Sequence, residues 1–261
     1  MQLTRGLANA FVILTICFLV LPLVIIIPIS FGSAQYIEFP PRGFSLQWYE
    51  RYVTDFIWVR ATFLSLKVAA LCSVIATTVG FIAALIIVRS GRFTAAFMEN
   101  YFTAPMIVPS VVFAVACYWV FSTLGLIGST LGIALAHSVI SVPLVLIIMT
   151  EGLSRFNVEI EQAAIGLGAS RLRALLTITV PTLRGSMLAS LGIAFLTSFD
   201  EVIIAIFISG AIPTLPKKMY DNLRVDIDPT IAAVSTIEIT FLILVTLLVV
   251  ATYRRRAISK G

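Results

Sequence analysis

The chain has 261 residues, of which 59% are hydrophobic and 12% are charged, and its formal net charge at pH 7 is +5. Its mean hydropathy of +1.05 exceeds what a soluble domain can bury in one core, so the composition excludes a soluble fold and indicates a membrane protein. A basic excess of this kind follows from membrane topology and does not indicate a nucleic-acid partner.

Long apolar runs dominate the sequence. A helix needs about 20 apolar residues to cross a hydrocarbon layer of roughly 30 Å, and six runs reach that length with few charges. In chain order they cover approximately 8–31, 61–88, 102–124, 129–150, 185–208 and 230–253. We therefore predict an all-α fold, a polytopic membrane bundle of six transmembrane helices that occupies residues 1–261 as a single domain.

The first run has features of a secretory signal peptide, because Arg5 precedes it and the small residues Gly32, Ser33 and Ala34 follow it. Its apolar stretch exceeds the roughly 7 to 15 residues of a signal peptide core, and five more runs follow. We therefore expect an uncleaved first helix.

Orientation follows from the distribution of Lys and Arg, which cytoplasmic loops retain near helix ends. With the N-terminus inside, eleven of these side chains fall on the cytoplasmic side and six on the other side, where Asp and Glu dilute them. Both termini are therefore expected in the cytoplasm. On the outer side, residues 44–58 carry Trp48, Tyr49, Tyr52 and Trp58, which predicts a segment at the membrane interface.

Ionisable groups inside the predicted spans need an explanation, because a lone charge near the bilayer centre costs roughly 2.5 to 3.5 kcal/mol. Lys67 and Glu238 lie at similar depths in the second and sixth spans, which favours a structural ion pair over contact with a substrate. For His137, the single histidine, a hydrogen-bonded packing role competes with a role in proton or substrate passage.

Two adjacent carboxylates, Asp200 and Glu201, lie about 15 residues into the fifth span, beyond its midplane toward the outside. Such a pair favours a path for a cation, and pairing with buried basic groups is the alternative. Adjacent helical positions differ by about 100°, so we expect one of the two, Asp200 by preference, to face the path.

No motif for catalysis or metal binding accompanies these groups. Cys17, Cys72 and Cys117 lie in separate apolar runs without a CxxC or Cys/His pairing, so we predict no metal site. An intramembrane enzyme using Ser198, Asp200 or His137 would need a nucleophile with a partnered base, and no recognised motif supplies one. The GxxxxGK[ST] phosphate loop is also absent, so ATP binding by that route is excluded.

The longest polar interval, residues 151–184, is typical of two short surface helices. Residues 159–167 contain good helix formers, and Gly168 follows where a helix commonly ends in the left-handed conformation. Ser170 can cap the next helix, which Pro181 interrupts or kinks. An amphipathic connector that lies on the membrane surface is the alternative interpretation.

This interval resembles the EAA loop of bacterial ABC importer permeases, whose pattern is EAA, three residues, Gly, nine residues and IxLP. The spacing fits completely, but Gln162 stands where the family has Glu, with Glu161 directly before it, and Val180 stands for Leu. The matching residues and the one that follows the glycine are Ala163, Ala164, Gly168, Ala169, Ile178 and Pro181. From ATFLSLKVA in the second run to TLPKKMYDNLR after the fifth, the chain is similar to polyamine-type, PotC-like permeases.

The resemblance implies that the chain is a transport subunit of the bacterial inner membrane and not an enzyme. It would form half of the pathway for a small cation such as putrescine or spermidine, which Asp200 and Glu201 would help to pass. The implied partners are a second, different permease subunit, two cytoplasmic ATPases that bind ATP and Mg, and an extracytoplasmic binding protein. No cofactor is implied in this chain.

The resemblance also implies that a short helix of the loop lies in a groove of the ATPase. Through this helix the closure of the ATPase would move the transmembrane bundle as a rigid body. Whether Gln162 or Glu161 makes the family's acidic contact stays open. Related permeases carry opines, other amines or metal complexes. The main alternative class is a proton-coupled secondary transporter with Asp200, Glu201 and His137 as its relay; six spans without an internal repeat and the matched loop favour the ABC permease.

Overall fold

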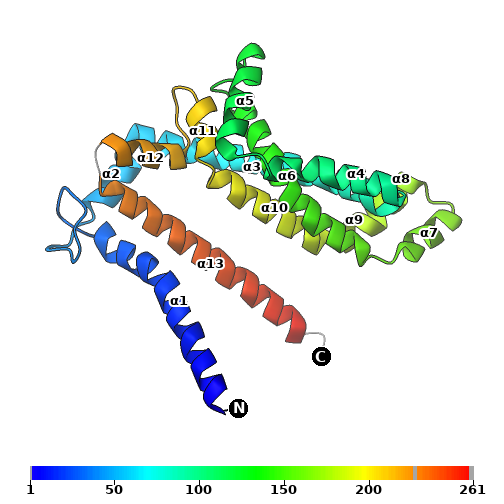
Figure 1. Cartoon of the computed structure of the whole chain (residues 1–261), viewed down its shortest axis with the longest axis horizontal. Helices are drawn as coiled ribbons and strands as arrows, with labels where there is room; N and C mark the ends of the chain where they lie inside the picture. The colour runs from blue at the N-terminus through cyan, green and yellow to red at the C-terminus, as the bar shows by residue number, and fades with distance from the viewer. Residues whose placement is uncertain (1, 226–227, 259–261) are drawn as a thin grey trace. The chain divides into compact units, whose positions relative to one another are not determined.

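The structure, a computed structural model, describes residues 2–225 and 228–258. Within these ranges every element is helical, apart from an isolated β-bridge between Gly32 and Phe44 (Figure 1). The chain divides into two compact units, one formed by residues 1–59 and 219–261 and the other by residues 60–218. The all-α prediction is confirmed, whereas the single domain over 1–261 stays a prediction.

Long helices are separated by groups of shorter ones, and Figure 1 labels the α-helices. In chain order they are α1 (Gln2–Ser30), α2 (Gln47–Thr54), α3 (Phe56–Arg89), α4 (Arg92–Thr103), η1 (Ala104–Met106), α5 (Ser110–Thr123), α6 (Thr130–Ser154), α7 (Val158–Gly166), α8 (Arg171–Ala174), η2 (Leu175–Thr179), α9 (Val180–Thr182), α10 (Arg184–Phe199), α11 (Ile203–Ile208), α12 (Leu215–Val225) and α13 (Thr230–Ile258). Of these, η1 is a 3-10 helix and η2 is a π-helix.

In the unit that contains both ends of the chain, α2 connects the end of α1 with the start of α13. The buried Trp48 donates its indole N–H to the carbonyl of Gly32, at 2.8 Å. On the same helix, Arg51 lies 3.5 Å from the carboxylate of Asp228. That carboxylate also accepts the backbone N–H of Thr230 at 2.9 Å, which caps α13. The predicted interfacial segment therefore contains a short helix fixed at both of its neighbours.

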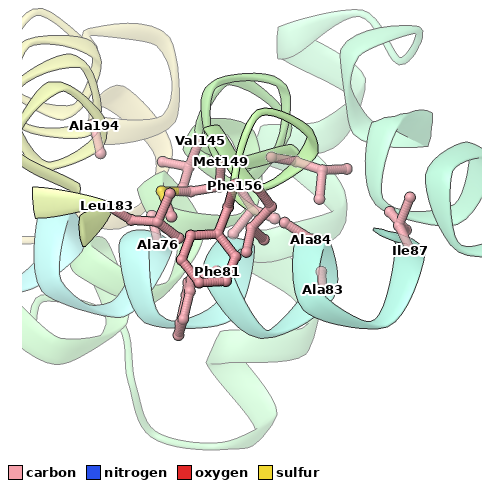
Figure 2. Packing of buried hydrophobic residues seen from close by; sticks show 13 residues of the cluster. Ala76, Phe81, Ala83, Ala84, Ile87, Val145, Met149, Phe156, Leu183 and Ala194 are labelled. Carbon is pink, nitrogen blue, oxygen red and sulfur yellow. The ribbon is translucent and has the colours of Figure 1, made fainter. Parts of the chain in front are cut away.

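In the unit of residues 60–218, α6 is the central helix. It packs along α10, and it approaches α3 so closely that a Cβ at Gly80 would lie 2.5 Å from a methyl carbon of Val145. Figure 2 shows the apolar cluster between α3 and α6, with Phe81 and Met149 near its centre. Phe156 and Leu183 belong to the same cluster and lie at the two ends of residues 157–182. This core therefore supports both attachment points of the polar loop.

The described helices bear out a protein with several membrane spans. Three are long and apolar enough to cross a bilayer, namely Asn9–Ser30, Phe56–Arg89 and Thr130–Ser154. Two bent pairs raise the number to five if each is one span: Arg92–Met106 with Ser110–Thr123, at 96°, and Arg171–Thr182 with Arg184–Phe199, at 73°. Residues Thr230–Leu244, the first part of α13, form a shorter apolar helical stretch. The count of six, with both termini inside, stays a prediction.

Two of the six predicted spans are not continuous helices. The run 102–124 begins in α4 and passes through η1 before α5 starts after Pro109, which cannot donate a backbone hydrogen bond. The run 185–208 is interrupted between α10 and α11, at Asp200 and Glu201. Both breaks place irregular backbone inside an apolar stretch, which is tolerated in a bilayer only where protein or a water-filled cavity surrounds it.

Candidate functional site

The first half of the loop is a short helix with a defined start and end. The side chain of Asn157 accepts the backbone N–H of Glu159 at 2.9 Å and caps α7. At the other end, Gly168 has a φ of +96°. Its N–H donates to the carbonyl of Ile165 at 2.9 Å, and the next N–H donates to the carbonyl of Ala164 at 3.0 Å. This is a Schellman motif, so the predicted helix end at Gly168 is confirmed.

The second half is less regular than a single helix. Ser170 caps α8 as predicted, because its hydroxyl accepts the N–H of Arg173 at 3.3 Å. The chain then widens into the π-helix η2, just before Pro181. Proline removes a hydrogen bond from the preceding turn and crowds its carbonyl, and a wider turn relieves that crowding. The sharp bend lies after Pro181, at the buried Leu183.

The EAA-type residues differ in their exposure. Gln162, Ala163 and Gly168 are exposed, as is Pro181. Ala164, Ala169 and Ile178 are half-buried, and Ile178 packs against the apolar cluster of Figure 2. Leu167, at the end of α7, is 91% exposed. The first helix thus presents small and polar side chains to the outside together with Val158 and Ile160, while the second packs against the core.

Glu161 points inward, unlike its neighbour Gln162. It is 5% exposed and is the buried residue of α7. The same carboxylate oxygen, Oε2, accepts two hydrogen bonds. One comes from the Arg89 guanidinium at 2.7 Å and the other from the hydroxyl of Thr179. Arg89 is the last residue of α3, and Thr179 is the last residue of η2. Glu161 therefore joins three segments of the unit.

The contact between Glu161 and Arg89 was not predicted from the sequence. From the sequence, Arg89 is one of the basic residues that orient the chain, and Glu161 is a candidate acidic contact for the ATPase. A signal was nevertheless present, because a basic residue ends the second apolar run and an acidic residue precedes the alanines. Their separation of 72 residues left their pairing undetermined without the fold.

The second candidate group lies at the break between α10 and α11. Asp200 is exposed and Glu201 is half-buried. Together with Leu196 and Thr197 they line an open hollow of about 400 Å³. Glu201 also accepts the backbone N–H of Ile204 at 3.0 Å, which caps the first turn of α11. Among the described residues, neither carboxylate forms an ion pair.

This geometry changes the expectation for the two carboxylates. Adjacent residues point about 100° apart only in a continuous helix, and the helix is broken at these two residues. The expectation that only one carboxylate faces the path therefore no longer follows. Both side chains line the same hollow. The preference for Asp200 over Glu201 stays a prediction.

His137 lies apart from the lining of that hollow. It is fully buried in α6, and its Nδ1 lies 2.9 Å from the hydroxyl of Ser198 in α10. Its Nε2 has no hydrogen-bond partner among the described residues. The contact ties two packed helices together, which favours a structural role over a place in the pathway.

The predicted ion pair between Lys67 and Glu238 would join the two units of the chain. Lys67 is exposed on α3, and Glu238 is half-buried on α13. Lys67 belongs to the unit of residues 60–218 and Glu238 to the other. Their pairing stays a prediction.

Comparison with known proteins identifies relatives over most of the chain. Residues 76–258 match a family described as "Binding-protein-dependent transport system inner membrane component". The putrescine transport system permease protein PotI of Escherichia coli K12 is 32% identical over 231 residues, covering 84% of this chain and 81% of that protein. The spermidine/putrescine permease PotC of Haemophilus influenzae is 27% identical over 234 residues, covering 89% and 91%. The molybdenum permease ModB of E. coli K12 is 30% identical over 185 residues, covering 64% and 80%.

Solved structures share the fold. A chain of a bacterial ABC transporter involved in the import of the acidic polysaccharide alginate aligns with a TM-score of 0.73 at 15% identity, covering 96% of both chains. An amino acid ABC transporter with histidines aligns with a TM-score of 0.56 at 18% identity, covering 82% of this chain and 99% of that one. At such identities the alignments establish the fold alone.

Proposed function

The chain belongs to the family of inner membrane components of binding-protein-dependent transport systems, and we propose that it forms half of the translocation pathway of an importer for small organic cations such as putrescine or spermidine. As a member of this family it is a multi-pass ABC permease subunit of the inner membrane and not an enzyme. Membership implies a substrate-binding protein and an ATPase as partners, and no cofactor in this chain.

The hollow at the break between α10 and α11 is the observation that supports a cationic substrate. Asp200 and Glu201 both line it, and neither is neutralised by an ion pair among the described residues. A polyamine has ammonium groups, which carboxylates attract and from which they accept hydrogen bonds. The names of the PotI and PotC relatives agree with this substrate class.

The polar loop supplies the contact with the ATPase in this proposal. Gln162 and Ala163 are exposed on α7, and their side chains leave the helix surface polar and shallow enough for a close approach. Leu167 adds an exposed apolar group at the end of the helix. Two ATPases, which bind ATP and Mg, would serve this chain and a second, different permease subunit.

In this arrangement the chain crosses the membrane six times, with both termini in the cytoplasm. The third crossing is formed by the end of α4 with α5, the fifth by α10 with α11, and the sixth by α13. The basic residues near the helix ends support this orientation.

The test is transport by the reconstituted complex. This chain would be purified with the permease, ATPase and binding protein that are encoded beside it, and placed in proteoliposomes. We expect ATP-dependent uptake of labelled putrescine that unlabelled spermidine reduces. A binding protein that selects an opine, another amine or a metal complex but no polyamine would overturn the substrate assignment, and uptake driven by a proton gradient without the ATPase would support a secondary transporter instead.

A further inference from the structure

Polar contacts of Glu161 attach α7 to the rest of the unit of residues 60–218. Glu161 is the buried residue of this nine-residue helix. Its partner Thr179 is fully buried, whereas the Arg89 side chain is 39% exposed. A helix of this length has little stability of its own, so its position depends on such contacts.

A buried carboxylate at this position needs hydrogen-bond donors or a cationic partner. Burying a charge without partners is strongly unfavourable, whereas an ion pair with an additional hydrogen bond offsets much of that cost. Both donors are present, from Arg89 and from Thr179. The three side chains therefore stabilise one relative position of α3, α7 and η2.

The inward and outward faces of α7 are separate. Gln162 follows Glu161 directly, and successive residues of a helix point about 100° apart. Gln162 is exposed while Glu161 is buried. Contact with a partner at Gln162 therefore leaves the Glu161 contacts in place.

We propose that Glu161 is a positioning residue, which makes α7, the end of α3 and η2 one rigid body. When α7 is displaced, the end of α3 and η2 therefore move with it, and the displacement reaches the membrane helices. This inference rests on the proposed function, in which the ATPase moves α7. Arg89 passes the displacement to α3, and Thr179 passes it through α9 toward α10. It also follows that the partner meets a neutral amide at Gln162 and not the carboxylate of Glu161.

The first test measures whether the contacts position α7. A spin label on α7 of the purified permease, without the ATPase, reports the mobility of the helix. We expect Glu161→Gln to increase that mobility, and the matched control Glu159→Gln, which removes an exposed charge from the same helix, to leave it unchanged. Equal mobility in wild type and Glu161→Gln would overturn the proposal.

The second test measures whether positioning matters for coupling in the complete transporter. We expect Glu161→Gln to co-purify with the ATPase but to lower the substrate transported per ATP hydrolysed by about fivefold or more, the lower range of coupling effects between sites. The exchange Arg89→Glu with Glu161→Arg should recover part of that ratio. An unchanged ratio in Glu161→Gln, beside a wild-type complex that couples normally, refutes the positioning role. A wild-type complex without any ATP-driven uptake refutes the proposed function instead.

A covalent replacement tests rigidity directly. Cysteines at positions 89 and 161, joined by a bifunctional thiol reagent in a background without the native cysteines, would substitute for the ion pair. We expect the cross-linked complex to transport better than the same variant before cross-linking. Loss of transport on cross-linking would show that α7 must move relative to α3, which contradicts a rigid body.

Discussion

The carboxylates of the cytoplasmic loop and those of the helix break have opposite surroundings. Glu161 is buried and accepts hydrogen bonds from Arg89 and Thr179. Asp200 and Glu201 border an open hollow, and among the described residues they have no cationic partner. The same chemical group therefore fixes structure in one region, whereas in the other Asp200 and one oxygen of Glu201 stay available to a ligand, the other Glu201 oxygen capping α11.

The difference shows that partners, rather than position in a motif, decide what a carboxylate can do. Glu161 lies near the EAA-type alanines, yet its Oε2 accepts hydrogen bonds from two donors inside the protein. Asp200 and Glu201 lie in a predicted span where charges are costly, and the helix break opens backbone and side chains to a hollow. A substrate cation can compete for the second group but not for the first.

The largest expected effect comes from removing the cation beside Glu161. Arg89→Ala leaves a buried carboxylate with one donor, which should lower the free energy of unfolding by about 2 to 3 kcal/mol, the usual cost of losing a hydrogen bond to a charged group. The measurement is thermal or denaturant unfolding of the purified permease in detergent. The control is Arg92→Ala, an exposed arginine three residues further on. Equal stability of the two variants would show that the Glu161 contacts carry no net stabilisation.

At the helix break we expect a loss of transport rather than a loss of stability. Asp200→Asn combined with Glu201→Gln should reduce the uptake of a divalent organic cation by about tenfold, equivalent to about 1.4 kcal/mol, while the free energy of unfolding changes within about 0.5 kcal/mol. Uptake in proteoliposomes and unfolding are compared for the same preparation. Loss of stability without a change in uptake would give this pair the structural role that we assign to Glu161.

Much of the loop was predictable because its signals are local. The cap at Ser170 and the left-handed end at Gly168 depend on residues close in sequence, and both predictions are confirmed. The contact between Arg89 and Glu161 was not predictable, because it depends on how α3 and the loop pack. Hydrophobicity also could not locate the break at Asp200, since apolar residues continue on both sides of it.

The local signal at Gly168 can itself be tested, with an effect of intermediate size. Gly168→Ala places a Cβ on a residue with a φ of +96°, where L-residues are strained. No neighbouring atom lies within 4 Å of that Cβ, so the cost is conformational rather than steric. We expect a loss of about 1 kcal/mol in helix stability, at the lower end of the penalty for the left-handed conformation. Limited proteolysis of the loop, compared with wild type and with Gly166→Ala inside the same helix, provides the measurement.

The smallest effect on stability is expected next to the buried carboxylate. Gln162→Glu restores the family's acidic residue at an exposed position, where substitutions usually change the free energy of unfolding by less than about 0.5 kcal/mol. Glu161→Gln, one position earlier, removes a charge from a buried ion pair and should lower stability clearly more, as measured by the same unfolding experiment. If Gln162→Glu were the more destabilising of the two, the inward face of α7 would have to contain Gln162. A small change for Gln162→Glu together with a large one for Glu161→Gln would instead establish that the neutral amide faces outward, so that its charge can be varied for the ATPase partner without disturbing the contact to α3.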